Sequence, residues 1–142
     1  MTHIYLLIGC AFAPTLAFIL VDGGFITNEL CIVGLSGVLF LGVGDTTAAL
    51  YGSTYGRATW SKKSNKTTQG TWACIIAVCI TYYLLLCMHE NPFFKGFFMV
   101  IAFATFLTSI IEGTTYQFDN LVCPIAFVVI MMHLFDMFFS IN

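Results

Sequence analysis

The sequence predicts an all-α integral membrane protein, a bundle of about five transmembrane helices. Of its 142 residues, 59% are hydrophobic and only 8% are charged, and the mean hydropathy is +0.94. Soluble domains carry about 25% charged residues, so a soluble fold of this size would lack the polar side chains that cover a wetted surface. Five apolar runs approach the roughly 20 residues that a bilayer core requires.

The five runs define the predicted spans. The first run has no basic residues before it and several apolar runs after it, so we expect a spanning helix there rather than a cleaved signal. The second run is shorter and rich in glycine. The predicted spans, in chain order, are residues 4–21, 30–43, 71–88, 93–111 and 121–139. The whole chain, 1–142, is therefore expected to form one transmembrane domain with a polar insert at 44–70.

A short helix is predicted directly after the second span. The sequence DTTAALYGSTY, residues 45–55, is built mainly from small residues. Asp45 precedes it as a potential N-cap, so the helix should begin at Thr46 and be re-entrant or interfacial. Non-helical backbone at membrane depth must be buried in protein or line a cavity, and a glycine-broken second span leading into this helix fits that requirement.

The basic residues predict the orientation of the chain. Four of the five Lys and Arg residues lie between Arg57 and Lys66, so this loop should face the cytosol. Counting spans outward from it places residues 42–70 and 112–120 on the same membrane face, where they can form one site. The net charge of −2 indicates no particular partner, and no nucleic-acid binding is expected.

Two glycines precede an acid and a hydroxyl in the segment Gly42-Val43-Gly44-Asp45-Thr46. Glycine allows backbone amides to approach a phosphate, and a helix beginning at Thr46 would favour an anion. Asp45 beside it would suit Mg²⁺, which takes one or two carboxylates together with substrate phosphates. The alternative is a plain helix break with a capping aspartate, and the chain contains no Walker motif.

A basic, hydroxyl-rich loop follows, with Lys62, Lys63, Lys66 and Thr67. Ammonium and hydroxyl groups hold a triphosphate by charge and hydrogen bonds. The alternative is a loop that only obeys the positive-inside rule and binds no ligand.

Two further acids, Glu112 and Asp119, lie in the predicted turn between the fourth and fifth spans. Acids against apolar spans are either functional or solvated at the interface. Together with Asp45 they predict a catalytic set for phosphoryl transfer, in which Asp45 and Asp119 hold the metal.

Three motifs resemble the dolichol kinase family. They are GVGDTTAALYGSTYGRATW at Gly42–Trp60, Lys66-Thr67-Thr68-Gln69-Gly70-Thr71, and Asp119-Asn120-Leu121 followed by Pro124. The resemblance covers roughly the last hundred residues. It extends more broadly to CTP-using membrane enzymes, among them phytol kinase, yeast-type diacylglycerol kinase and phosphatidate cytidylyltransferase.

The resemblance implies transfer of the CTP γ-phosphate to the hydroxyl of dolichol at the endoplasmic reticulum membrane, with a divalent cation such as Mg²⁺. It places CTP binding on Lys66, Thr67, Gly70 and Thr71, and it matches the family's acid to Asp45. Two features depart from the family. Gln69 stands where relatives commonly have an acid, so no carboxylate acts there, and a longer basic loop blurs the roles of Lys62 and Lys63.

Several alternatives stay open at this point. The acceptor could be another lipid alcohol such as phytol or diacylglycerol, or the chain could transfer a cytidylyl group to lipid. Dolichol kinases usually have many more spans before this region, so the chain could also be an inactive membrane fragment or a non-enzymatic subunit. A homo-oligomer is also compatible with the sequence.

Overall fold

A computed structural model describes residues 2–22, 34–61, 65–88, 94–115 and 119–139. Within these ranges the regular secondary structure is helical, apart from one isolated antiparallel bridge between Thr59 and Thr67. Residues 34–39 are α-helical. The remaining elements are α1 (Thr2–Asp22), the π-helix η1 (Phe40–Asp45), α3 (Thr46–Tyr55), α4 (Thr68–Met88), α5 (Phe94–Thr114) and α6 (Asp119–Phe139).

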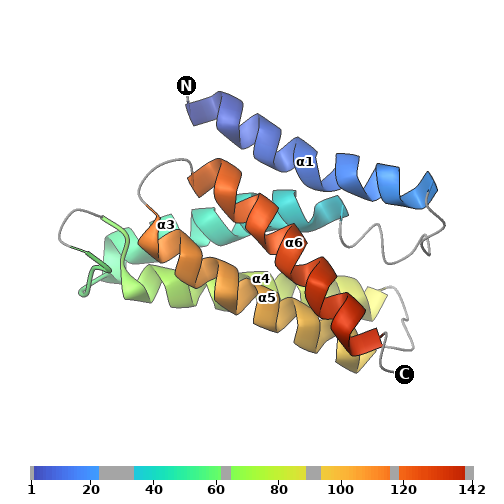
Figure 1. Cartoon of the computed structure of the whole chain (residues 1–142). Coiled ribbons are helices and arrows are strands. Elements are labelled where there is room, and N and C mark those ends of the chain that lie inside the picture. The colour runs from blue at the N-terminus through green and yellow to red at the C-terminus, as the bar shows by residue number, and fades with distance from the viewer. Residues whose placement is uncertain (1, 23–33, 62–64, 89–93, 116–118, 140–142) are drawn as a thin grey trace.

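The helices pack as a bundle in which neighbours along the chain lie side by side. Contacts join α3 to α4, α4 to α5, α5 to α6 and α6 to α1, and η1 touches both α4 and α6. Figure 1 shows α1 on the outside against α6, and it shows α3, the start of α4 and the start of α6 at one end of the bundle. This arrangement gathers segments that are far apart in sequence at that end.

Aromatic side chains fill the core where η1, α4 and α6 meet. Phe40, Tyr82 and Phe127 are fully buried or nearly so. The ring of Phe127 stacks on Phe40 with centroids 5.3 Å apart, and it lies 6.2 Å from the ring of Tyr82. These contacts fix η1 against the two helices and thereby set the position of the α3 segment that follows it.

The predicted all-helical class is confirmed, and four predicted spans correspond to α1, α4, α5 and α6. In the described part of the chain, Thr68–Met88 and Gly96–Thr114 are long and apolar enough to cross a membrane. The described apolar stretches of the other two helices are shorter, at Leu7–Leu16 and Leu121–Leu134. Both of the longer helices fit a membrane protein.

The predicted short helix is confirmed, since α3 begins at Thr46, but the helix break expected before it is wrong. Helical residues 34–39 continue through η1 into α3. Asp45 has helical dihedral angles of −63° and −41° and makes no capping hydrogen bond with its side chain, while the Thr46 amide donates to the carbonyl of Val43. Gly44 serves packing instead, since a Cβ there would lie 2.9 Å from Cys74 Sγ. The absence of a side chain lets α4 approach this helix.

Candidate functional site

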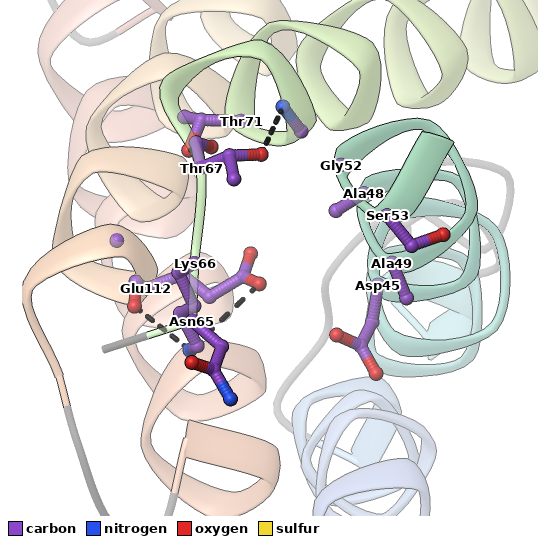
Figure 2. Close-up of a pocket in the computed structure, with 12 residues that line it drawn as sticks. Asp45, Ala48, Ala49, Gly52, Ser53, Asn65, Lys66, Thr67, Thr71 and Glu112 are labelled. Atoms are coloured by element: carbon purple, nitrogen blue, oxygen red, sulfur yellow. Dashed lines mark hydrogen bonds and ion pairs between the residues drawn. The ribbon is translucent and has the colours of Figure 1, made fainter. Parts of the chain in front are cut away.

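A cavity of about 390 Å³ opens at the end of the bundle where α3, the start of α4 and the end of α5 meet. Figure 2 shows residues of α3 along one wall and residues of the loop, α4 and α5 along the other. The lining residues are Asp45, Ala48, Ala49, Gly52, Ser53, Asn65, Lys66, Thr67, Gly70, Thr71, Glu112 and Gly113.

The α3 wall follows helical periodicity. Its lining positions are 45, 48, 49, 52 and 53, which is the i, i+3, i+4, i+7, i+8 pattern of one helix face. Four of the five residues are alanine, glycine or serine, so this face leaves space, and Asp45 contributes its one charge. The small residues of the predicted short helix therefore form one wall of the cavity.

The basic loop is held in place by backbone hydrogen bonds. The Trp60 amide donates to the Lys66 carbonyl at 3.0 Å, and the Thr68 amide donates to the Ala58 carbonyl at 2.9 Å. Gln69 Oε1 accepts from the amides of Arg57 and Ala58 at 3.2 and 3.3 Å. Gln69 thus supplies an oxygen acceptor that fixes the start of the loop.

A capped helix N-terminus, which the sequence predicted at Thr46, is found instead at the start of α4. Thr67 precedes α4, and its Oγ1 accepts a hydrogen bond from the Gly70 amide at 3.1 Å, which is N-cap geometry. Gly70 allows α4 to approach α3, because a Cβ there would lie 2.7 Å from the Ala48 carbonyl oxygen. The positive end of the α4 dipole therefore lies beside the cavity, since Thr67, Gly70 and Thr71 all line it.

Lys66 links the loop to the end of α5. Its Nζ donates to the backbone carbonyl of Glu112 at 2.9 Å and lies 4.0 Å from the carboxylate Oε1. The two side chains are 26% and 12% exposed, respectively. Glu112 was expected in a turn, but it lies within α5 and is buried. It shares one face of that helix with buried Ser109, three residues earlier.

The cavity brings together six of the residues predicted from the sequence. Asp45, Lys66 and Glu112 supply charge, and Thr67, Gly70 and Thr71 form the α4 start. The six come from three separate segments, at residues 45, 66–71 and 112. The predicted meeting of residues 42–70 and 112–120 at one end is confirmed for Lys66 and Glu112, which contact each other.

The other predicted residues divide into two groups. Gly42, Gly44 and Thr46 do not line the cavity, because the continuous helix uses their backbone groups and Gly44 faces α4. Lys62 and Lys63 lie outside the described residues. Asp119 is the first residue of α6, and its side chain is outside the described part as well.

The other six lining residues were not predicted as site residues; they are Ala48, Ala49, Gly52, Ser53, Asn65 and Gly113. The four on α3 share the helical period that contains Asp45, and this period was a signal that could have identified them. Gly113 follows Glu112 directly, but position 113 requires glycine because of a residue distant in sequence. A Cβ at this position would lie 2.6 Å from Trp60 Nε1.

The donor set suits a hard divalent cation bound together with phosphate. Asp45 and Glu112 are the carboxylates that line the cavity, and carboxylate oxygens are preferred Mg²⁺ ligands. Among the described residues there is no group of three or more His, Cys, Asp or Glu side chains that could hold a metal ion by itself. Mg²⁺ commonly relies on one or two carboxylates and on the phosphates of its substrate, so the residues present fit this ion.

The sequence is similar to dolichol kinases from distant organisms. It is 34% identical over 129 residues to the dolichol kinase EVAN of Arabidopsis thaliana, in a match that covers 89% of this chain and 21% of that protein. It is 37% identical over 126 residues to the dolichol kinase sec59 of Schizosaccharomyces pombe, covering 87% and 23%. The human dolichol kinase matches at 32% over 133 residues, covering 93% and 24%.

No protein-family model matches the chain, and no solved structure matches it. The chain spans less than a quarter of the length of these three relatives. The matches nevertheless cover nearly all of its own residues, and the three relatives come from a plant, a fungus and a mammal. Over almost its whole length, this chain is a homologue of part of the dolichol kinases.

Proposed function

We propose that this chain transfers the γ-phosphate of CTP to the hydroxyl of dolichol and so supplies dolichyl phosphate for protein glycosylation. The observation that carries the proposal is the cavity in which two carboxylates, one lysine and the start of α4 meet. The homology to dolichol kinases supports the choice of lipid. CTP as donor rests on the wider family resemblance of the Lys66–Thr71 motif.

The nucleotide phosphates are assigned to the loop and the start of α4. Lys66 supplies a positive charge, and the helix dipole of α4 adds a partial positive charge at its N-terminus. Thr67 Oγ1 already accepts from the Gly70 amide, which leaves the hydroxyl's own hydrogen for a phosphate oxygen. Lys62 and Lys63 belong to the same basic segment and are proposed as further phosphate contacts.

The acids are assigned to the metal and to the alcohol. Asp45 would hold Mg²⁺ from the α3 wall, with Asp119 at the start of α6 as the second proposed ligand. When bound, the ion neutralises charge on the transferring phosphoryl group. Glu112 would orient the alcohol and accept its proton. Most of the acceleration of phosphoryl transfer comes from positioning and electrostatic stabilisation, for which this cavity offers charges on opposite walls.

The proposed setting is the endoplasmic reticulum membrane with the cavity facing the cytosol. Residues 1–142 would form a single domain with the five predicted spans, and the second of these, predicted at 30–43, would lead into α3. The cavity then lies near the membrane surface, where CTP arrives from water and the dolichol hydroxyl arrives from the bilayer. The small residues of the α3 face, Ala48, Ala49 and Gly52, leave room for that hydroxyl.

The test uses purified chain in lipid nanodiscs with dolichol, Mg²⁺ and CTP labelled at either the α- or the γ-phosphate. The expected result is γ-label on the lipid and CDP in solution. Label from the α-phosphate on the lipid, with release of pyrophosphate, would show a cytidylyltransferase instead. Phytol and diacylglycerol are run in parallel, and faster transfer to either would reassign the acceptor. No transfer to any of the three would refute the proposed enzyme.

Asp45→Asn tests the site itself. We expect transfer to fall at least about 100-fold, because loss of one metal-holding carboxylate removes several kcal/mol of transition-state stabilisation. Asp22→Asn is the matched control: Asp22 ends α1, and α1 ends far from α3 in the bundle (Figure 1). Equal activity of the two variants would remove Asp45 from the mechanism.

A further inference from the structure

We infer that Trp60 is a positioning residue that holds Lys66 and Thr71 at the wall of the cavity without itself lining it. The inference rests on the proposed function for its catalytic meaning, but the contacts that carry it are independent of the substrate. Trp60 is 37% exposed and lies in the basic loop, five residues before Asn65, where the lining of the cavity resumes. Its side chain and its backbone each make a separate connection to the site.

The indole nitrogen makes the first connection. Trp60 Nε1 donates to Thr71 Oγ1 at 2.8 Å, and the Thr71 hydroxyl in turn donates to the Thr67 carbonyl at 3.3 Å. Thr71 lines the cavity and Trp60 does not, so the hydrogen bond from the indole fixes the hydroxyl oxygen of a side chain in the cavity wall. A hydroxyl that both accepts and donates to fixed partners has little rotational freedom left.

The face of the ring makes the second connection, to the end of α5. A Cβ on Gly113 would lie 2.6 Å from Trp60 Nε1, 2.7 Å from Cε2 and 3.0 Å from Cδ1. Any side chain at position 113 would therefore displace the ring. Gly113 also lines the cavity and directly follows Glu112, whose carbonyl accepts the hydrogen bond from Lys66.

The backbone makes the third connection. The Trp60 amide donates to the Lys66 carbonyl at 3.0 Å, beside the bridge between Thr59 and Thr67. Lys66 is thus tied to Trp60 through its own backbone and to Glu112 through its ammonium group. The ring of Trp60 lies against Gly113 and completes this set of contacts, so a displacement of the ring shifts the loop segment that carries Lys66 and Thr67.

The first test is a set of single and double variants assayed for the KM for CTP and for kcat. We expect Trp60→Ala and Gly113→Ala each to raise the KM about 10-fold while kcat changes less than about 3-fold, since both displace phosphate-binding groups. Trp60→Phe keeps an aromatic ring but loses the N–H and the pyrrole part of the indole, so its KM should rise by about 3-fold, less than in Trp60→Ala. In the Trp60→Ala background, Gly113→Ala should add less than about 2-fold, because the ring that it displaces is gone.

Additive effects of Trp60→Ala and Gly113→Ala would overturn the inference, as would a KM for CTP that stays at the wild-type value in Trp60→Ala. A fall in kcat alone, with the KM unchanged, would also overturn it. The melting temperature of each variant is measured in the same nanodiscs. A KM increase that scales with loss of stability across the set would show a merely structural residue and would refute the positioning role.

Two readouts separate this inference from the proposed function. The chain has two tryptophans, so Trp72→Phe leaves Trp60 as the sole tryptophan, which is excited selectively over the tyrosines. In that background, Gly113→Ala should raise the acrylamide quenching constant about 2-fold as the ring moves into water; an unchanged constant would refute the ring contact. The Kd for labelled CTP is measured by equilibrium dialysis. Binding without transfer refutes the proposed function and still tests Trp60 through Kd, whereas a wild-type chain that binds no CTP overturns both.

Discussion

Two glycine-to-alanine substitutions test whether the packing of α3 on α4 builds the cavity. At Gly70, a Cβ would lie 2.7 Å from the Ala48 carbonyl oxygen and 3.1 Å from Thr67 Oγ1. The first of these neighbours is backbone, which cannot move without shifting α3 itself. At Gly42, a Cβ would meet nothing within 4 Å. The same chemical change therefore has opposite structural consequences at the two positions.

The expected magnitudes follow from three contributions. Alanine gains about 1 kcal/mol over glycine in a helix interior. At Gly70 this gain is exceeded by overpacking, which costs about 1–3 kcal/mol, and by strain on the Thr67 cap, worth about 1 kcal/mol. The net expectation is a loss of about 1–3 kcal/mol for Gly70→Ala. Gly42→Ala should be neutral or more stable by up to about 1 kcal/mol.

Both variants are measured by thermal unfolding in the same detergent, followed by circular dichroism, with the KM for CTP determined in parallel. Gly70→Ala should melt lower than the wild type and bind CTP more weakly, because α3 is pushed away from the start of α4. Gly42→Ala should leave the KM unchanged, since Gly42 does not line the cavity. Gly70→Ala that melts as high as Gly42→Ala would refute the close contact between the two helices.

Substitutions at three further positions, each with a conservative control, address the loop and the start of α4. Lys66→Met should raise the KM for CTP about 10- to 100-fold, because a charge-assisted hydrogen bond is worth about 1.5–3 kcal/mol, while Lys66→Arg should retain part of the affinity. A KM for CTP in Lys66→Met within about twofold of the wild-type value, roughly the resolution of a steady-state assay, would remove Lys66 from the phosphate site. Thr67→Val should lower the free energy of unfolding by about 1 kcal/mol because it removes the cap, whereas Thr67→Ser keeps the hydroxyl and should not lower it. Unfolding in urea or SDS measures both variants, and an equal loss of unfolding free energy in the two would argue against the cap. Gln69→Leu removes the acceptor of the exposed Arg57 and Ala58 amides and should cost about 0.5–1.5 kcal/mol, because water can replace the lost oxygen. Gln69→Glu keeps the acceptor oxygen and should be tolerated, and thermal unfolding of both variants decides.

The long helices were predictable because each apolar run in this sequence is long and separated from the next by polar residues. The predicted starts and ends lie close to those of α1, α4, α5 and α6. The composition alone also indicated lipid as the solvent. Topology then placed Lys66 and Glu112 at one end, since antiparallel neighbours return the chain to the same face, and their hydrogen bond bears this out.

The helix start beside the cavity was not predictable from local sequence. Asp45 and Thr67 both precede helix-forming residues, and both are good N-caps by residue type. The choice between them depends on distant contacts: Gly44 packs on Cys74 and keeps the chain helical through Asp45, whereas Thr67 is held in an antiparallel bridge with Thr59. A capping rule considers only the few residues next to a helix start, so it cannot take either of these contacts into account.

The π-helix at Phe40–Asp45 has a consequence for how this protein tolerates length changes. A π-turn holds one residue more than an α-turn, and one residue corresponds to a rotation of about 100° around the helix axis. Deletion of a single residue between Phe40 and Asp45 would convert this π-turn into an α-turn. Because the lost residue is the one that the π-turn holds in excess, the buried ring of Phe40 would stay in place, and Asp45, Ala48 and Gly52 would still face Lys66. The same deletion within α3, which has no excess residue, would rotate the residues after it by about 100° and present a different face to the cavity. The π-helix is therefore a place where this helix can lose one residue and keep the wall of the cavity in register.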